Sequence, residues 1–128
     1  MPDYSGHMTH DEYTSLIWQK LLGLAQDTLN DKIGIVEATL HMEPILYELR
    51  LSNDADLQAI IGLGSECDYM VFGEEAKLKP HLVYEQQPHL RACETASRET
   101  IKSACRAILS RCAQRGTDLQ AQSEQAET

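Results

Sequence analysis

The sequence lacks the features that would assign it to several common classes of protein. No apolar run approaches the roughly 20 residues of a membrane span, and no charged-then-apolar leader opens the chain. The four cysteines form no C-x-x-C pair, and there is no H-E-x-x-H, G-x-S-x-G or Walker sequence. We therefore expect a cytoplasmic, non-enzymatic protein of bacterial type, with no membrane association and no bound metal or other cofactor.

Basic residues are also scarce. Lys and Arg total 11 against 20 for Asp and Glu, which gives a net charge of -9. A field of this sign repels nucleic-acid backbones and anionic membranes and attracts basic partners. The length of 128 residues is that of one ordinary domain and is enough to bury a core without disulfide or metal staples.

Apolar residues recur at a spacing of three and four along most of the chain, which predicts an all-α, mainly helical fold. The first helix should begin near Thr9, whose spacing to Glu12 is that of a capping box, and should end at Asn30. A second helix is predicted from about residue 32 to 51. Pro44 lies inside it and predicts a kink or a break just before it.

The second half of the chain predicts one short and one long helix. The short helix is capped by residues 52–54 and halted by Gly62 and Gly64. The long helix has Pro88 in its first turn and Gly116 just past its end. The expected fold is thus a small helical bundle of three longer helices and one short helix, with an irregular loop around residues 62–80.

This pattern predicts one helical domain, residues 9–116, between two irregular ends. Residues 117–128 are rich in Gln, Ser, Glu and Ala and are expected to form a disordered polar tail. Residues 1–8 contain Ser-Gly-His-Met ahead of a second possible start, and they are interpreted as an expression-tag remnant or a disordered N-terminus.

The cysteines and histidines suggest chemistry but do not establish it. His89 and Cys93 have the i, i+4 spacing of two metal ligands on one helix face, yet a zinc site normally needs four such groups, and no other pair supplies them. Cys67 lies between Glu66 and Asp68, whose charges raise a thiol pKa and oppose a nucleophilic role. We expect the four cysteines to be free thiols packed in the core.

Charge is distributed unevenly along the chain. Residues 43–75 contain eight acidic residues against Arg50 alone, whereas residues 91–115 contain six basic residues against two acidic ones. The two regions could neutralise each other inside the fold, partly through pairs such as Glu94 with Arg98. Alternatively, the acidic stretch and its aromatic residues could bind a protein partner with a basic surface. The candidate partner-binding residues are Glu43, Glu48, Asp54, Asp56, Glu66, Asp68, Tyr69, Phe72, Glu74 and Glu75.

Residues 35–49, 54–57 and 61–68 resemble a family of uncharacterised small acidic bacterial proteins. In that family a helix with a Leu-rich end precedes a Gly-x-x-Ser-Glu-x-Asp loop and a long last helix. The likeness covers about Ile33 to Cys112, although Pro44 and the lack of an aromatic residue before the last helix depart from it. The resemblance implies a bacterial origin and a helical fold, without an activity.

In general character the chain is also similar to the immunity proteins of bacterial toxin systems, which are small, acidic and cytoplasmic. The leading hypothesis is an immunity protein that neutralises a toxin through its acidic surface. The alternative is a helical adaptor or secretion-chaperone-like module that acts as a homo-oligomer, with a homodimer as its simplest form.

Overall fold

The computed structural model describes residues 9–127, with side chains up to Arg115. The helices are α1 (His10–Leu29), α2 (Ile35–Glu48), a 3₁₀ turn η1 (Ala55–Leu57), α3 (Gln58–Glu66), α4 (Gly73–Leu78) and α5 (Pro80–Glu127). The described residues contain no strand, which confirms the predicted all-α class. The interpretation of residues 1–8 and the very end of the predicted tail, Thr128, lie outside the described residues.

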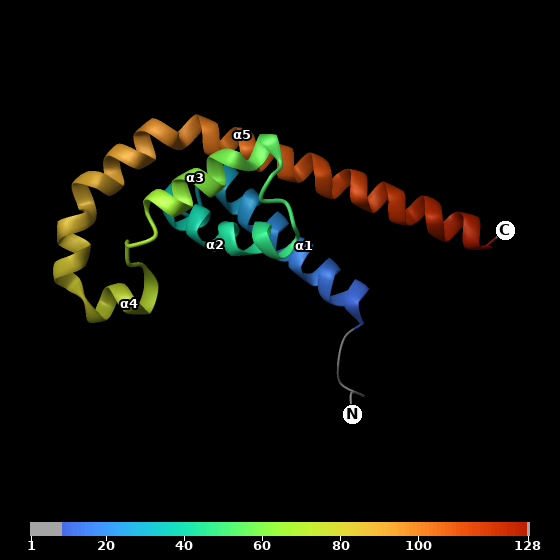
Figure 1. Cartoon of the computed structure of the whole chain (residues 1–128), viewed down its shortest axis with the longest axis horizontal. Coiled ribbons are helices and arrows are strands. Elements are labelled where there is room, and N and C mark those ends of the chain that lie inside the picture. The colour runs from blue at the N-terminus through green and yellow to red at the C-terminus, as the bar shows by residue number, and fades with distance from the viewer. Residues whose placement is uncertain (1–8, 128) are drawn as a thin grey trace, which may run out of the picture.

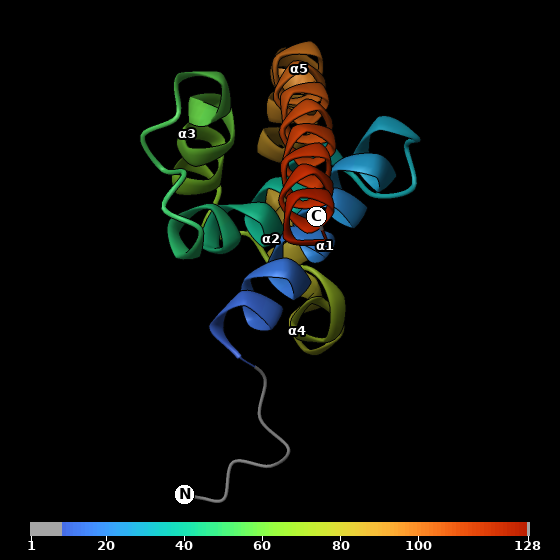
Figure 2. The ribbon, with the colours of Figure 1, turned by 90° about the vertical axis from the view of Figure 1, so that its right-hand side faces the viewer.

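The bundle is built around two central helices, α2 and α5. α1 and α3 each pack against both of them, and α1 and α3 do not contact each other. Figure 1 shows α1, α2 and α3 under the middle of α5, whereas α4 and the start of α5 extend to one side and the end of α5 to the other. Viewed along α5 in Figure 2, α3 lies on one flank of the bundle. No helix within residues 9–127 has the length and apolar character to cross a bilayer.

The core is organised by one apolar face of α5. Ile101, Ala104, Cys105 and Ile108 are all buried, and their spacing of three and four places them on one side of the helix. This confirms the three-four rhythm predicted for the last helix. Residues from the other helices complete the same core cluster, and they include Leu21, Ala25, Met42, Leu46, Leu57, Ile60 and Leu63.

Two helix starts follow the predicted local caps, and a third uses a distant residue. Thr9 accepts a hydrogen bond from the Glu12 N–H at 3.1 Å, and Asp54 caps η1 in the same way. α2 begins after Gly34, which has no side chain to accept such a bond. The Glu94 carboxylate on α5 accepts from the Val36 N–H at 3.0 Å instead. Glu94 therefore caps α2 and does not form the predicted pair with the arginine one turn later.

Several helices continue past residues where the sequence predicted a stop or, at Pro44, a kink or a break. α2 continues through Pro44 to Glu48, because an exposed proline removes one backbone hydrogen bond without ending a helix that packs along its other face. α3 continues through both predicted stop glycines to Glu66. Gly64 is buried, and a Cβ atom there would collide with the Glu43 carboxylate of α2. This glycine therefore permits close packing of α2 and α3.

The predicted irregular region around residues 62–80 is mostly helical. It contains the end of α3, the whole of α4 and the first residue of α5, so only residues 67–72 and Lys79 are non-helical. α5 begins at Pro80 and not near Pro88, because proline fits the first turn of a helix. Pro88 lies inside α5, which continues past it. Figure 1 shows α5 following a wide arc in its first half, where Pro88 removes one backbone hydrogen bond.

The end of α5 also differs from the prediction. The backbone stays helical past Gly116 to Glu127, where the sequence predicted a stop and a disordered tail. A single glycine inside a helix costs only about 1 kcal/mol relative to alanine, and the Gln, Glu and Ala that follow favour helix. The last residues of α5, from about Gly116 onward, therefore extend the helix beyond the bundle (Figure 1).

Replacing Ile101 or Ile108 by alanine should lower the free energy of unfolding by about 2–5 kcal/mol, because each removes a fully buried side chain from the shared core. Urea denaturation followed by circular dichroism measures the change. Ser103→Ala, at an exposed position of the same helix, is the matched control and should change the stability by less than about 0.5 kcal/mol. A loss below about 1 kcal/mol at both isoleucines would contradict the core assignment.

Candidate functional site

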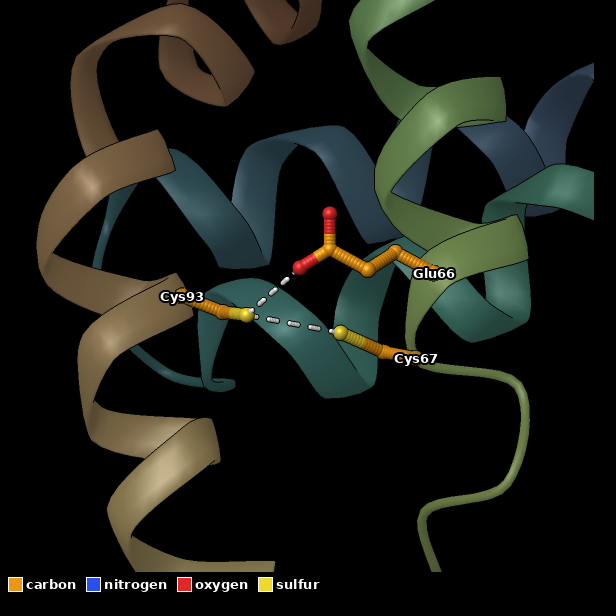
Figure 3. Close-up of side chains that lie close together, drawn as sticks. All are labelled: Glu66, Cys67 and Cys93. Atoms are coloured by element: carbon orange, nitrogen blue, oxygen red, sulfur yellow. Dashed lines mark hydrogen bonds between the residues drawn. The ribbon is translucent and has the colours of Figure 1, made fainter.

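Two thiols and a carboxylate meet where the end of α3 faces α5. Cys67 is the C-terminal cap of α3 and Cys93 lies on α5; both side chains are buried, with 3.7 Å between their sulfur atoms. The Cys93 thiol also donates to Oε2 of Glu66 at 3.2 Å. Figure 3 shows the three side chains converging from the two helices. We call Glu66, Cys67 and Cys93 the thiol cluster.

A histidine and a tyrosine extend the thiol cluster to the surface. Nε2 of His89 lies 3.2 Å from Oε2 of Glu66, and Nδ1 of the same ring is hydrogen-bonded to the Tyr69 hydroxyl. The two rings are stacked, with centroids 5.9 Å apart and an interplanar angle of 9°. Both residues are exposed. A continuous polar path therefore connects a buried thiol to solvent through Glu66, His89 and Tyr69.

The segment that follows α3 is fixed by a glutamine from α5. The buried Gln86 side chain accepts from the Val71 N–H and donates to the Val71 carbonyl, each at 2.9 Å. This pair of bonds satisfies both backbone groups of a buried residue outside any helix. Met70 and Val71 are buried beside it. The backbone carrying Tyr69 is therefore attached to the same helix that carries His89 and Cys93.

Burial and the nearby carboxylate keep the thiols protonated. Burial is the largest cause that raises the Cys93 pKa, to about 12, and the hydrogen bond to Glu66 raises it further. Burial also raises the pKa of Cys67, with smaller contributions from Glu66 and Asp68, in the direction predicted from the sequence. Hydrogen bonds from Cys93 and His89 lower the pKa of Glu66. Because a nucleophile needs the thiolate, this arrangement disfavours a cysteine nucleophile.

Part of the acidic stretch pairs with the basic last helix. Asp54 and Asp56 both contact the Arg111 guanidinium of α5 at 2.9 Å, which attaches η1 to the bundle. Outside the acidic stretch, Asp31 pairs with Arg98 at 2.6 Å and with Lys102 at 3.0 Å. Neutralisation inside the fold therefore accounts for two of the ten candidate partner-binding residues.

Most other candidates have local partners. Glu43 accepts from Ser65 at 3.2 Å and Glu48 from the Tyr13 hydroxyl. On α4, Glu74 pairs with Lys77 at 3.0 Å and Glu75 with Lys79 at 3.4 Å. Glu66 belongs to the thiol cluster, and Phe72 packs against the core. Asp68 and Tyr69 are exposed on the segment between α3 and α4. The ten residues come from five different segments of the chain, and the structure brings only some of them together.

The thiol cluster combines residues that the sequence patterns considered separately. The spacing of His89 and Cys93 indicated a possible pair of metal ligands. Glu66 was considered only as a neighbour whose charge raises the pKa of Cys67. No local pattern indicates that Cys67 and Cys93, which are 26 residues apart, come together. Only the packing of α3 against α5 creates the site.

Comparison with known proteins adds no relative to this picture. No protein-family model matches the chain, and neither a curated protein nor a solved structure matches it significantly. What the protein does must therefore follow from its own residues.

Arg111→Met should lower the free energy of unfolding by about 1–3 kcal/mol, because it leaves Asp54, whose side chain is only 17% exposed, without its cation. Lys77→Met removes one member of a fully exposed pair on α4 and should cost less than about 0.5 kcal/mol. Urea denaturation of the two variants measures both values. Equal effects would show that the contact between η1 and α5 is no stronger than a surface ion pair.

Thiol reagents should label native metal-free protein slowly at Cys67, Cys93 and Cys105, because these side chains are buried and their raised pKa values leave little thiolate at pH 8. Cys112 is half-buried and should react first. Mass spectrometry of labelled peptides over time identifies each site, with urea-unfolded protein as the reference for full reaction. Labelling of native Cys93 at the unfolded rate would contradict its placement.

Proposed function

We propose that this chain acts by binding another protein. The observation that carries the proposal is that residues 69–87, which we call the arm, carry three large side chains that are exposed to solvent. Leu78 is 81% exposed and Tyr84 is 83% exposed, and Tyr69 adds a half-exposed ring at the start of the arm. Exposed large side chains, aromatic ones above all, are common anchors of protein interfaces.

The position of the arm supports a role in contact with a partner. Among the described helices, α4 lies close only to α5, and no residue of α4 is buried. Figure 1 shows α4 and the start of α5 apart from the bundle formed by α1, α2 and α3. α4 therefore contributes little to the core of the bundle, and the exposed side chains of Leu78 and Tyr84 are available to another molecule.

Charge indicates a basic partner. The chain has a net charge of -9, and the arm carries Glu74, Glu75 and Glu85. Two of these pair with Lys77 and Lys79, but the pairs are exposed and such pairs contribute only about 0–1 kcal/mol. A cationic partner can therefore replace the two lysines at little cost, while the overall field accelerates its approach.

An immunity protein is the form of this function that we propose. A toxin that acts on nucleic acid needs a basic surface to hold its substrate, and a small acidic protein can block that surface by charge and shape. The proposal rests on the size and acidity of the chain together with the exposed arm. The described residues form no recognisable catalytic constellation that would favour an enzyme instead.

A second candidate function follows from the length of α5. The backbone of α5 continues as a helix well beyond the bundle, and an isolated helical extension is only marginally stable in water. Packing of this extension against the same segment of a second copy would stabilise it, as in a homo-oligomeric adaptor. Light scattering after size-exclusion chromatography distinguishes the two: a monomer at all concentrations would remove the adaptor and leave the immunity function.

The double variant Leu78→Ser, Tyr84→Ser should weaken binding to the product of the neighbouring gene by about thirtyfold or more, because it removes the two most exposed anchors of the arm. Isothermal titration calorimetry at low and high salt gives the affinity, which should fall as salt rises. Tyr47→Ser, at an exposed position on α2, is the matched control and should bind normally. No complex at low salt, or equal affinity of the arm variant and the natural chain, would contradict the proposal.

A further inference from the structure

We propose that the thiol cluster is a Zn²⁺ site in which Glu66, Cys67 and Cys93 bind the ion and His89 supplies the fourth ligand. The ligand atoms of the first three residues lie within 4.8 Å of one another. His89 lies one helical turn before Cys93 and has one ring nitrogen directed at Glu66. This site goes beyond the binding role of the arm and does not depend on it.

The distances between the polar atoms match those around a tetrahedral zinc ion. Zinc binds sulfur at about 2.3 Å and nitrogen or oxygen at about 2.0 Å, so its ligands stand about 3.8 Å apart for two sulfurs, about 3.5 Å for sulfur and oxygen and about 3.3 Å for oxygen and nitrogen. The corresponding distances here are 3.7 Å between the two thiols, 3.2 Å from Cys93 to Glu66 and 3.2 Å from Glu66 to His89. Three edges of the tetrahedron are therefore already present.

Tyr69 orients the ring of His89, the proposed fourth ligand, as hydrogen-bonding neighbours of zinc-binding histidines usually do. A histidine that binds zinc through one nitrogen normally forms a hydrogen bond through the other, which fixes the orientation of its ring. Nδ1 of His89 is bonded to the Tyr69 hydroxyl, and the two rings are stacked. Nε2 is directed toward Glu66, and the His89 side chain must turn toward the two sulfur atoms to complete the site.

The donor set selects zinc over the common hard cations. Thiolate ligands suit zinc, whereas magnesium and calcium take oxygen ligands. In the metal-free cluster both thiols hold their protons, so each ion that binds displaces two protons, one from Cys67 and one from Cys93. Binding should therefore strengthen as the pH rises. Glu66 and His89 are exposed, which gives the ion a route from solvent to the buried sulfur atoms.

Cobalt titration tests the site, because Co²⁺ occupies zinc sites and its thiolate bonds absorb in the near ultraviolet. The full chain is purified without a histidine tag, reduced and treated with a chelator that is then removed. We expect one Co²⁺ per chain, a thiolate-to-cobalt absorption band, the visible bands of tetrahedral cobalt, and loss of all of these when one equivalent of Zn²⁺ is added. Elemental analysis of untreated protein should show zinc.

Variants decide which residues hold the ion. Cys67→Ser and Cys93→Ser should each reduce the thiolate band by about half or abolish it, and His89→Gln should weaken cobalt binding by about tenfold or more. Cys112→Ser is the matched control, since its thiol lies outside the cluster, and it should leave the titration unchanged. Circular dichroism verifies that each variant is folded.

Three results would overturn the proposal. One is the absence of a thiolate band in the reduced natural chain. Another is a band of full intensity in folded Cys67→Ser or Cys93→Ser protein. The third is an octahedral cobalt spectrum, which would place the ion on surface carboxylates and not on the cluster.

Discussion

Burial of one apolar face of α5 is the constraint that holds the four main helices together. α1 and α3 do not contact each other, so each depends on α5 and α2 for a surface on which to bury its own apolar side chains. Ile101 and Ile108 lie at the centre of that face and are fully covered. Because apolar contact is not directional, it provides stability without fixing how the helices are aligned.

Polar residues on the same helix fix that alignment. Glu94 caps the start of α2, and Arg111 holds Asp54 at the start of η1. The first contact satisfies a backbone N–H at the start of α2, and the second neutralises the carboxylate that caps η1, so each favours one register of α5 against its neighbour. α5 therefore supplies both the core surface and the contacts that position α2 and η1 on it.

The features that could be predicted from the sequence are those that depend on neighbouring residues. The caps at Thr9 and Asp54 act over two or three positions, and the stripe of α5 repeats within one helix, so both were visible in the sequence. The contact from Glu94 to α2 spans 58 residues and leaves no local signal. Gly64 was interpreted as a stop because its real role, close packing against α2, is a property of two helices.

In the acidic stretch and the thiol cluster, too, the features set by neighbouring residues could be predicted and those set by helix packing could not. The sequence indicated that the acidic residues either pair with the last helix or face a partner. The structure shows the first for Asp54, which pairs with α5, whereas Glu74 is exposed on the arm and pairs with Lys77. The direction of the Cys67 pKa shift could be predicted from its two acidic neighbours. Its meeting with Cys93 could not, because it depends on how α3 packs against α5.

The thiol cluster lies at the junction between the bundle and the arm, and this position gives its chemistry a structural consequence. Residues 67–72 leave α3 at the cluster and are attached to α5 only one and two turns away, through Gln86 and through the pairing of Tyr69 with His89. A carboxylate beside two buried thiols is stable only while the thiols keep their protons or while a cation replaces them.

The protonated and the metal-bound states would differ in how strongly they join α3 to α5. Protonated thiols connect α3 to α5 through weak sulfur hydrogen bonds, whereas a bound ion would join the same helices through strong bonds to Cys67 and Cys93. The arm leaves the bundle beside the cluster, so a metal ion bound there would lie next to the segment that carries the surface we propose a partner recognises.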